Sequence, residues 1–367
     1  MQDSSSSPTD GAPSAVDRVI QSQYLFPFVL VTSLFALWGF ANDITNPMVA
    51  AFKNVLLLTN TQSSLVQSAF YGGYCFMAIP AAIFIKRFSY KSGILMGLAL
   101  YVTGCFLFVP AGGMQQFAPF LLAYFVMTCG LSFLETTANP YVLSMGSEAT
   151  ATRRLNLAQA FNPIGSITGM FIAKEFILAR LNSTSEAERR VLAETDTAKF
   201  DEIAQSDLSV IVGPYVTLGI VVSVVFVIFA IVKFPHTSTT AGKGLDLGGT
   251  MSRLLKKPVY VWGVMAQAFY VGAQIMCWTF IIQYAGATMG MAKADAQGYN
   301  IIAMVIFVSS RFICTFILRY FRPGQLLGCL AIGGGVLILG TIFLPGMTGL
   351  WCLVGVSACM SLMFPTI

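Results

Sequence analysis

The chain has 367 residues, of which 56% are hydrophobic and only 10% are charged, and its formal net charge is +5. Soluble domains carry about 25% charged residues, so this composition excludes an ordinary soluble domain. The excess of basic residues is small, and nucleic acid is not an expected partner.

Residues 1–23 form a polar tail that lacks the basic and apolar regions of a secretory signal peptide. Nearly charge-free runs follow it, and about 20 such residues in a helix cross the hydrocarbon of a bilayer. The sequence therefore predicts an all-α membrane protein embedded in a lipid bilayer. We expect ten membrane helices, at 24–45, 62–85, 92–112, 117–146, 155–179, 208–232, 258–285, 297–318, 325–344 and 350–367.

The helices fall into two groups with related features. The second and the eighth helix each end in basic residues, and a tight turn leads directly into the next membrane helix, in FIKRFSYKSGILMG and FILRYFRPGQLLG. Repeated halves are typical of secondary transporters, whose substrate site lies between them. We expect one six-helix bundle at 24–235, a cytoplasmic linker at 236–257 and a second bundle at 258–367. Because only four helices fit into the last range, the chain is expected to be truncated after about ten helices.

Basic residues mark every second short loop, at 86–91, 153–154, 243–257 and 319–322. Positively charged loops remain on the cytoplasmic side, so we expect these loops and the N-terminus in the cytoplasm. The longer loop at 180–207 also carries bases, but its acids outnumber them. The expected location is the plasma (inner) membrane, crossed several times.

Among the charged residues inside the predicted membrane helices, Asp43, Glu135 and Arg311 are the three good candidates for function. A charge at the bilayer centre costs roughly 2.5–3.5 kcal/mol on insertion scales, so such residues indicate a functional site by default. For Arg311, pairing with a carboxylate or a place on the cytoplasmic side of its bundle is the simpler expectation. Asp43 lies nearer a helix end, where an interfacial or capping role is the alternative.

Asn–Pro pairs occur in NDITNP (42–47), ETTANP (135–140) and FNP (161–163), within or near the ends of membrane helices. Proline lacks an amide hydrogen and frees the carbonyl four residues earlier, which here belongs to Asp43, Thr136 or Gln159. Free polar backbone at membrane depth is tolerated only beside protein or a wet cavity. The pattern therefore predicts a shared polar cavity in the first half.

Amides and carboxylates near these prolines suit sugar hydroxyls, which need hydrogen-bond donors and acceptors at once. Glu135 and Asn139 are four residues apart and share a helix face. We expect Glu135 and Asp43 to couple protons to substrate binding. The expected sugar ligands are Asn42, Asn46, Asn139, Gln159, Asn162 and, as an aromatic platform, Trp278. The alternative for the amides is that they bond helices to one another.

Other functional classes find little support. The single histidine, His236, lies at the end of a helix, and HExxH, GxSxG and ATP-binding motifs are absent from the sequence. The eight cysteines lie in apolar runs without CxxC spacing and are expected to be core residues, not metal ligands. We therefore expect neither an enzyme nor a cofactor or metal site.

Several segments carry a resemblance to a known family: FALWGFAND, LVQSAFYGGY, LETTANPYV, RLNLAQAFN, AQIMCWTF and the final FPTI. They resemble the fucose permease branch of the major facilitator superfamily, from about Pro27 to the last residue. The resemblance implies two six-helix bundles, alternating access, and uptake of L-fucose or a related monosaccharide driven by a proton gradient, in a monomer. Uptake of glucose or galactose, and a membrane sugar sensor that does not transport, are the alternatives.

The resemblance also implies roles for particular residues. Glu135 matches the family's helix-4 glutamate, which is linked to sugar recognition and proton coupling, and Gln159 and Asn162 match its polar pair on helix 5. The first helix departs from the family pattern, because the family's fucose permeases can carry an acid where this chain has Asn46. Such permeases then carry an amide at the position that Asp43 occupies in this chain.

Overall fold

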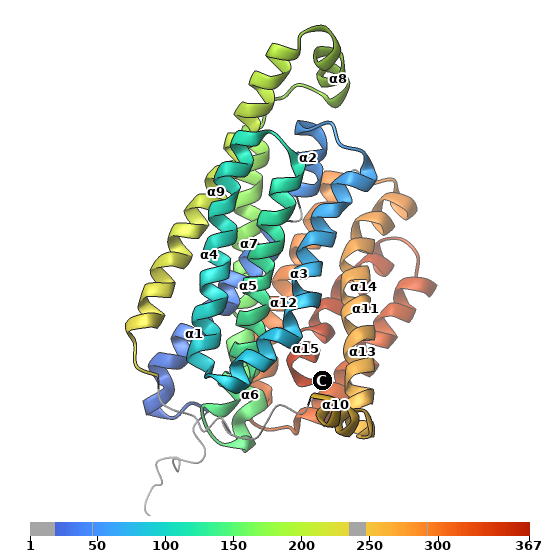
Figure 1. Cartoon of the computed structure of the whole chain (residues 1–367). Coiled ribbons are helices and arrows are strands. Elements are labelled where there is room, and N and C mark those ends of the chain that lie inside the picture. The colour runs from blue at the N-terminus through green and yellow to red at the C-terminus, as the bar shows by residue number, and fades with distance from the viewer. Residues whose placement is uncertain (1–18, 46, 235–246, 292) are drawn as a thin grey trace, which may run out of the picture.

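A computed structural model of the chain describes residues 19–45, 47–234, 247–291 and 293–367. Helices and their connections make up the described part, which contains no strand. Figure 1 shows the helices running side by side along one direction. Helix α8 marks one end of the molecule, and α10 marks the other; these are called the α8 end and the α10 end below. The all-α fold is the one predicted.

The first half contains nine α-helices and four shorter helical turns. The α-helices are α1 (Leu25–Thr45), α2 (Met48–Val55), α3 (Asn60–Arg87), α4 (Tyr90–Met114), α5 (Phe117–Ser144), α6 (Ala151–Gln159), α7 (Asn162–Ile172), α8 (Glu186–Thr195) and α9 (Thr197–Ile231). The shorter turns are η1 (Ser22–Tyr24), η2 (Glu148–Thr150), the π-helical η3 (Ala173–Ile177) and η4 (Leu178–Arg180). The pairs α4 with α5, α3 with α5, α1 with α7 and α4 with α9 make the main contacts.

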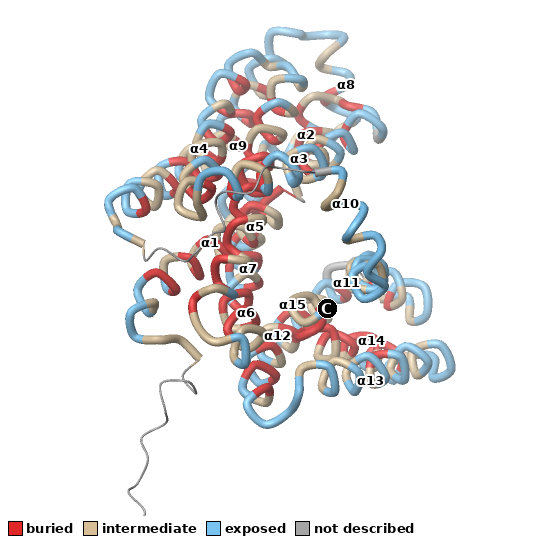
Figure 2. Tube along the Cα trace, turned by 60° about the horizontal axis from the view of Figure 1, so that its bottom comes forward, coloured by how far each residue is buried: buried red, intermediate tan, exposed pale blue. Residues whose placement is uncertain are grey.

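The second half packs separately beside the first. Its helices are α11 (Pro258–Met289), α12 (Lys293–Ile317), α13 (Pro323–Phe343), α14 (Met347–Met360) and the short α15 (Met363–Thr366). Helix α10 (Leu247–Leu255) lies in the expected linker, whose first part is outside the described residues, as are residues 1–18 of the tail. Figure 2 shows α11, α13 and α14 on one side of the molecule, and α4 and α9 on the other.

Nine helices of the described part are long and apolar enough to cross a membrane. They coincide with nine of the ten predicted spans, although α9 begins well before the span predicted at 208–232. The span predicted at 155–179 is interrupted: α6 ends at Gln159 and α7 begins at Asn162, with Pro163 in its first turn. The first span also stops where predicted, since α1 ends at Thr45, just before Pro47. By contrast, α5 continues through Pro140.

Helix ends follow local chemistry. The Thr59 hydroxyl accepts a hydrogen bond from the amide of Gln62, whose side chain accepts one from the Thr59 amide, so α3 begins with a capping box. Helix α11 begins at Pro258 and ends before Gly290, which has a φ of +62°. Proline at the start and glycine in the left-handed region at the end are both favourable there.

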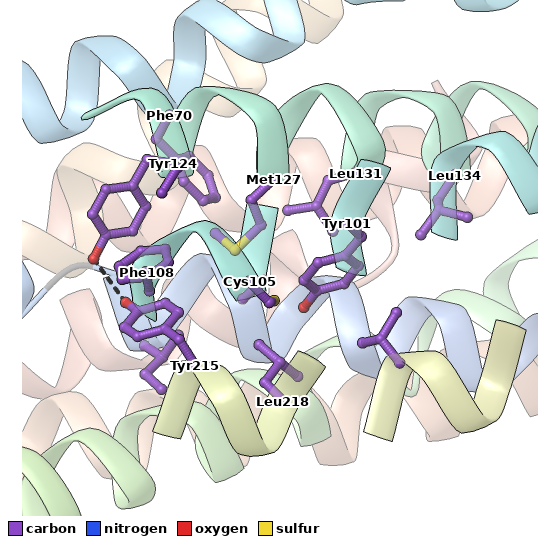
Figure 3. Packing of buried hydrophobic residues seen from close by; sticks show 14 of the residues in the cluster. Phe70, Tyr101, Cys105, Phe108, Tyr124, Met127, Leu131, Leu134, Tyr215 and Leu218 are labelled. Atoms are coloured by element: carbon purple, nitrogen blue, oxygen red, sulfur yellow. Dashed lines mark hydrogen bonds between the residues drawn. The ribbon is translucent and has the colours of Figure 1, made fainter. Parts of the chain in front are cut away.

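The core of the first half is aromatic and lies where α3, α4, α5 and α9 meet (Figure 3). The rings of Phe108 and Tyr215 stack at a centroid distance of 3.9 Å. The hydroxyls of Tyr124 and Tyr215 share a hydrogen bond of 2.8 Å. Buried hydroxyls need such partners, because an unsatisfied polar group in an apolar interior is costly. This core fixes α5 against its neighbours.

Helices α1 and α7 touch through their backbones. Side-chain-free positions at Gly39 and Gly165 make this possible, since a Cβ on Gly39 would overlap the carbonyl of Asn162 and one on Gly165 the carbonyl of Ala36. Small residues allow membrane helices to approach this closely. The contact places Asn162, the first residue of α7, beside α1.

The halves meet mainly where α6 and α7 lie against α12 and α15. Figure 2 shows α6, α12 and α15 together near the middle of the view. The Asn156 side-chain amide donates to the Thr366 hydroxyl at 3.3 Å, and the Phe161 ring meets the Phe312 ring edge-on at 6.0 Å. The two halves are therefore joined through the interrupted span of the first half.

Candidate functional site

A cavity of about 360 Å³ opens between α3 and α5. Helix α5 contributes one face of it, and the lining residues are Tyr74, Ala78, Ser132, Glu135, Thr136, Asn139 and Pro140. Ligand pockets start at a volume of about 300 Å³, so the cavity is large enough for a small polar molecule. The Thr136 carbonyl, which Pro140 deprives of its helical donor, belongs to a residue of this wall, as the sequence predicts.

Glu135 faces this cavity and is half-buried. In the described part of the chain its carboxylate makes neither a hydrogen bond nor an ion pair. The Tyr74 hydroxyl interacts with it electrostatically and is itself buried, with no hydrogen-bond partner among the described residues. The Trp38 indole lies near that hydroxyl without the geometry of a hydrogen bond. A carboxylate and a phenol thus face one small cavity with hydrogen-bonding capacity left over.

Asn139 of the cavity wall contacts Gln159, which does not itself line the cavity. The Gln159 side-chain amide donates to the Asn139 side-chain carbonyl at 2.9 Å. Gln159 is only 3% exposed and is the last residue of α6. Because Asn139 lies one turn from Glu135 on α5, this bond connects the cavity wall to the interrupted span.

Asp43 interacts with a second tyrosine of α3. It is half-buried near the end of α1 and interacts electrostatically with Tyr71 of α3. Tyr71 and Tyr74 are three residues apart on one face of α3 and also interact with each other. Each of the two acidic residues therefore interacts with a different tyrosine of α3.

The other predicted ligands are more dispersed. The Asn162 amide donates to the Phe35 carbonyl at 3.2 Å, and Asn42 is half-buried on α1. Trp278, in the second half, donates to the Ser357 hydroxyl at 3.2 Å and does not line the cavity around Glu135. Asn46 lies outside the described residues.

Sequence reasoning missed Tyr74 and Ser132, which line the cavity beside Glu135. The available signal was YGGY at 71–74, which places two phenols on one face of a membrane helix. Of the two glycines between them, Gly73 is tightly packed, because a Cβ there would overlap the Thr128 side chain of α5. The described residues contain no group of three or more His, Cys, Asp or Glu side chains that could hold a metal ion.

A bundle of membrane helices in two halves, with an interrupted span and an acidic side chain facing a polar cavity, defines a secondary transporter. The Major Facilitator Superfamily model matches residues 30–367. The chain belongs to this superfamily. It is a multi-pass membrane transporter and not an enzyme.

Individual relatives and solved structures show which members of the superfamily this chain resembles. The chain is 52% identical over 352 residues to the L-fucose-proton symporter of Haemophilus influenzae, covering 95% of this chain and 82% of that one. It is 31% identical over 364 residues to the glucose/galactose transporter of Brucella abortus, covering 97% and 82%. A solved structure of the Escherichia coli fucose:proton symporter matches with a TM-score of 0.84 at 35% identity, covering 94% of this chain and 83% of that one. A proton:xylose symporter, with a TM-score of 0.66 at 16% identity, shares the fold.

Proposed function

We propose that this transporter couples the movement of protons down their gradient to the uptake of L-fucose or a related monosaccharide. The observation that carries the proposal is the Glu135 carboxylate, which faces a cavity of about 360 Å³ without an internal partner in the described residues. The identity of 52% to an L-fucose-proton symporter supports the sugar class. The proton gradient is the proposed energy source, without a cofactor.

Glu135 is the proposed link between proton and sugar. Removing a carboxylate from water disfavours its charged form, so the apolar surroundings of α5 favour proton uptake. A protonated carboxyl donates and accepts hydrogen bonds, whereas an ionised one only accepts. Sugar hydroxyls therefore bind the two forms with different affinity, and this difference is a thermodynamic coupling between the two ligands.

The remaining residues have proposed roles as ligands. Asn139 presents its amide group at the cavity wall, Gln159 bonds that amide from behind, and the Tyr74 hydroxyl adds a buried donor beside Glu135. Asp43 is proposed as a second acid that exchanges protons or binds sugar from the end of α1. Asn42, Asn46 and Asn162 are proposed to complete the polar side, and Trp278 to cover an apolar sugar face when the halves close around it.

The test is uptake of radiolabelled L-fucose into proteoliposomes with and without an inward proton gradient. Glu135→Gln keeps the shape of the neutral form, so it should bind sugar and exchange it while losing accumulation against a gradient. Glu148→Gln, at an exposed residue in the loop between α5 and α6, is the matched control and should accumulate sugar normally. Gradient-driven accumulation by Glu135→Gln would refute the proposed coupling. Asp43→Asn in the same assay should weaken uptake.

The identity of the sugar is tested by competition. Unlabelled L-fucose, D-glucose and D-galactose are added in turn to the labelled uptake. The B. abortus relative favours glucose or galactose as a second candidate. Inhibition by D-glucose or D-galactose with L-fucose ineffective would overturn the fucose assignment and leave proton coupling intact.

The orientation in the membrane is also a proposal. The α10 end carries the basic positions at 86–91, 153–154 and 319–322, and positive loops remain cytoplasmic. We therefore place the α10 end and the N-terminus in the cytoplasm, and a single chain suffices for the proposed cycle.

A further inference from the structure

Of the three candidates Asp43, Glu135 and Arg311, Arg311 is the one that the proposed coupling does not use. It lies on α12, is only 4% exposed, and makes no ion pair in the described part of the chain. A buried guanidinium without compensation would be strongly unfavourable. Its compensation therefore has to come from elsewhere in the structure.

Two main-chain carbonyls supply it. The Arg311 Nε donates to the Ser361 carbonyl at 2.5 Å, and Nη1 donates to the Gln159 carbonyl at 3.2 Å. Both carbonyls stand four residues before a proline, Pro365 or Pro163, so neither has the usual helical donor. The Phe307 ring lies 4.6 Å from the guanidinium carbon and covers one face of it.

The two acceptors also lie at helix C-termini. Gln159 is the last residue of α6, and Ser361 directly follows the end of α14. A helix C-terminus carries roughly half a negative charge, so two of them facing one guanidinium offset about one positive charge. The arginine is thus neutralised by backbone, and the sequence expectation of a carboxylate partner is replaced by these carbonyls.

The bond to Gln159 crosses from one half of the molecule to the other. Ser361 and Phe307 belong to the same half as Arg311 and hold its side chain in place, while Gln159 belongs to the first half. The other attractive contacts named between the halves are uncharged, an amide–hydroxyl bond of 3.3 Å and an aromatic pair, while Arg153 and Arg319 face each other across the halves as like charges. Hydrogen bonds to charged groups are stronger than such neutral ones.

We infer that Arg311 is a latch between the bundles, which holds them together through the carbonyl that Pro163 leaves free on Gln159. Gln159 also bonds Asn139 on the cavity wall, so the latch holds that wall in place. Arg311 is therefore a positioning residue: it acts through Gln159 and does not touch the sugar. The inference takes from the proposed function only that the halves separate at this contact during transport.

Asn156→Cys supplies a reporter of the latch. Asn156 is 0% exposed and bonds Thr366 of the second half, so this position is uncovered when the halves separate. Cys105, in the aromatic core of the first half, is fully buried and becomes reactive only when that half unfolds. Alkylation of both by N-ethylmaleimide, measured by peptide mass spectrometry on the same protein sample, separates opening of the contact from unfolding.

In that background we expect Arg311→Gln to raise the alkylation rate of the introduced cysteine by about tenfold or more, because one charge-assisted hydrogen bond is worth at least that factor. Cys105 should remain protected. Arg322→Gln removes an exposed charge just beyond α12 and should leave the rate unchanged. An unchanged rate in Arg311→Gln would overturn the inference.

Pro163→Ala provides a second test that leaves the charge in place. It restores an amide hydrogen that competes for the Gln159 carbonyl, so the cysteine introduced at Asn156 should again react faster. The double variant should gain less than the product of the two single effects, since both remove one contact. If Arg311→Gln exposes Cys105, the Pro163→Ala variant is decisive, and an unchanged rate at the introduced cysteine refutes the latch. The assay contains no sugar, so failure of L-fucose to bind the wild type would refute the proposed function alone.

Discussion

Replacing Gly165 by alanine tests how the contact between α1 and α7 supports the site. An added Cβ would lie 2.6 Å from the carbonyl carbon of Ala36, and it would overlap the carbonyl oxygen. Ordinary contacts lie at 3.4–4 Å. The two helices would have to separate by roughly 1 Å, which is enough to forfeit a quarter to a half of the dispersion attraction across the contact.

The expected loss of stability follows from two opposing effects. Overpacking costs about 1–3 kcal/mol, while alanine gains about 1 kcal/mol over glycine in a helix. Because the Cβ overlaps a main-chain oxygen that cannot rotate away, the upper end of the overpacking cost applies, and a net loss of about 2 kcal/mol should lower the midpoint of thermal unfolding by roughly 2–3 °C for a protein of this size. Separation of α1 and α7 would also lengthen the 3.2 Å bond from Asn162 to Phe35. If Asn162 binds sugar as proposed, L-fucose affinity should fall about fivefold.

The assay is the fraction of protein that remains monodisperse after heating in detergent, together with L-fucose binding by calorimetry. Gly213→Ala is the matched control, because a Cβ there meets no described atom within 4 Å in the middle of α9. This control should keep or raise the midpoint. A Gly165→Ala protein with the midpoint and affinity of the wild type would show that the helices are not in backbone contact.

Two further outcomes are expected. Tyr74→Phe removes the buried hydroxyl beside Glu135, so L-fucose affinity measured by calorimetry should fall about tenfold. The unfolding midpoint measured by heating should change little. An unchanged affinity would show that Tyr74 is not part of the site. Cysteine introduced at Ala187 of α8 should react with an impermeant maleimide added outside intact cells, and cysteine at Ser252 of α10 should not; the opposite pattern would invert the proposed orientation.

Much of the architecture could be predicted because membrane insertion is decided locally. Removal of an apolar helix from water depends on its own residues, so hydropathy alone located the segments that became α1, α3 and α5. The interruption between α6 and α7 could also be predicted, since Pro163 has no amide hydrogen to donate in any surroundings. Helical periodicity also placed Glu135 and Asn139 on one face, and both line the cavity.

Other features depend on which helices pack together, and no local pattern contains that information. The sequence indicates that the Gln159 carbonyl lacks a helical donor, but only the packing of α6 against α12 supplies Arg311 as its partner. Likewise, Tyr74 is one of many membrane tyrosines until α3 and α5 close around a cavity and bury its hydroxyl near Glu135. Hydrophobicity sets where each helix lies relative to the membrane, whereas hydrogen bonds between helices require a particular rotation and depth of both partners. The sequence by itself therefore determined the spans and their polar faces, and the tertiary structure decided which polar groups meet.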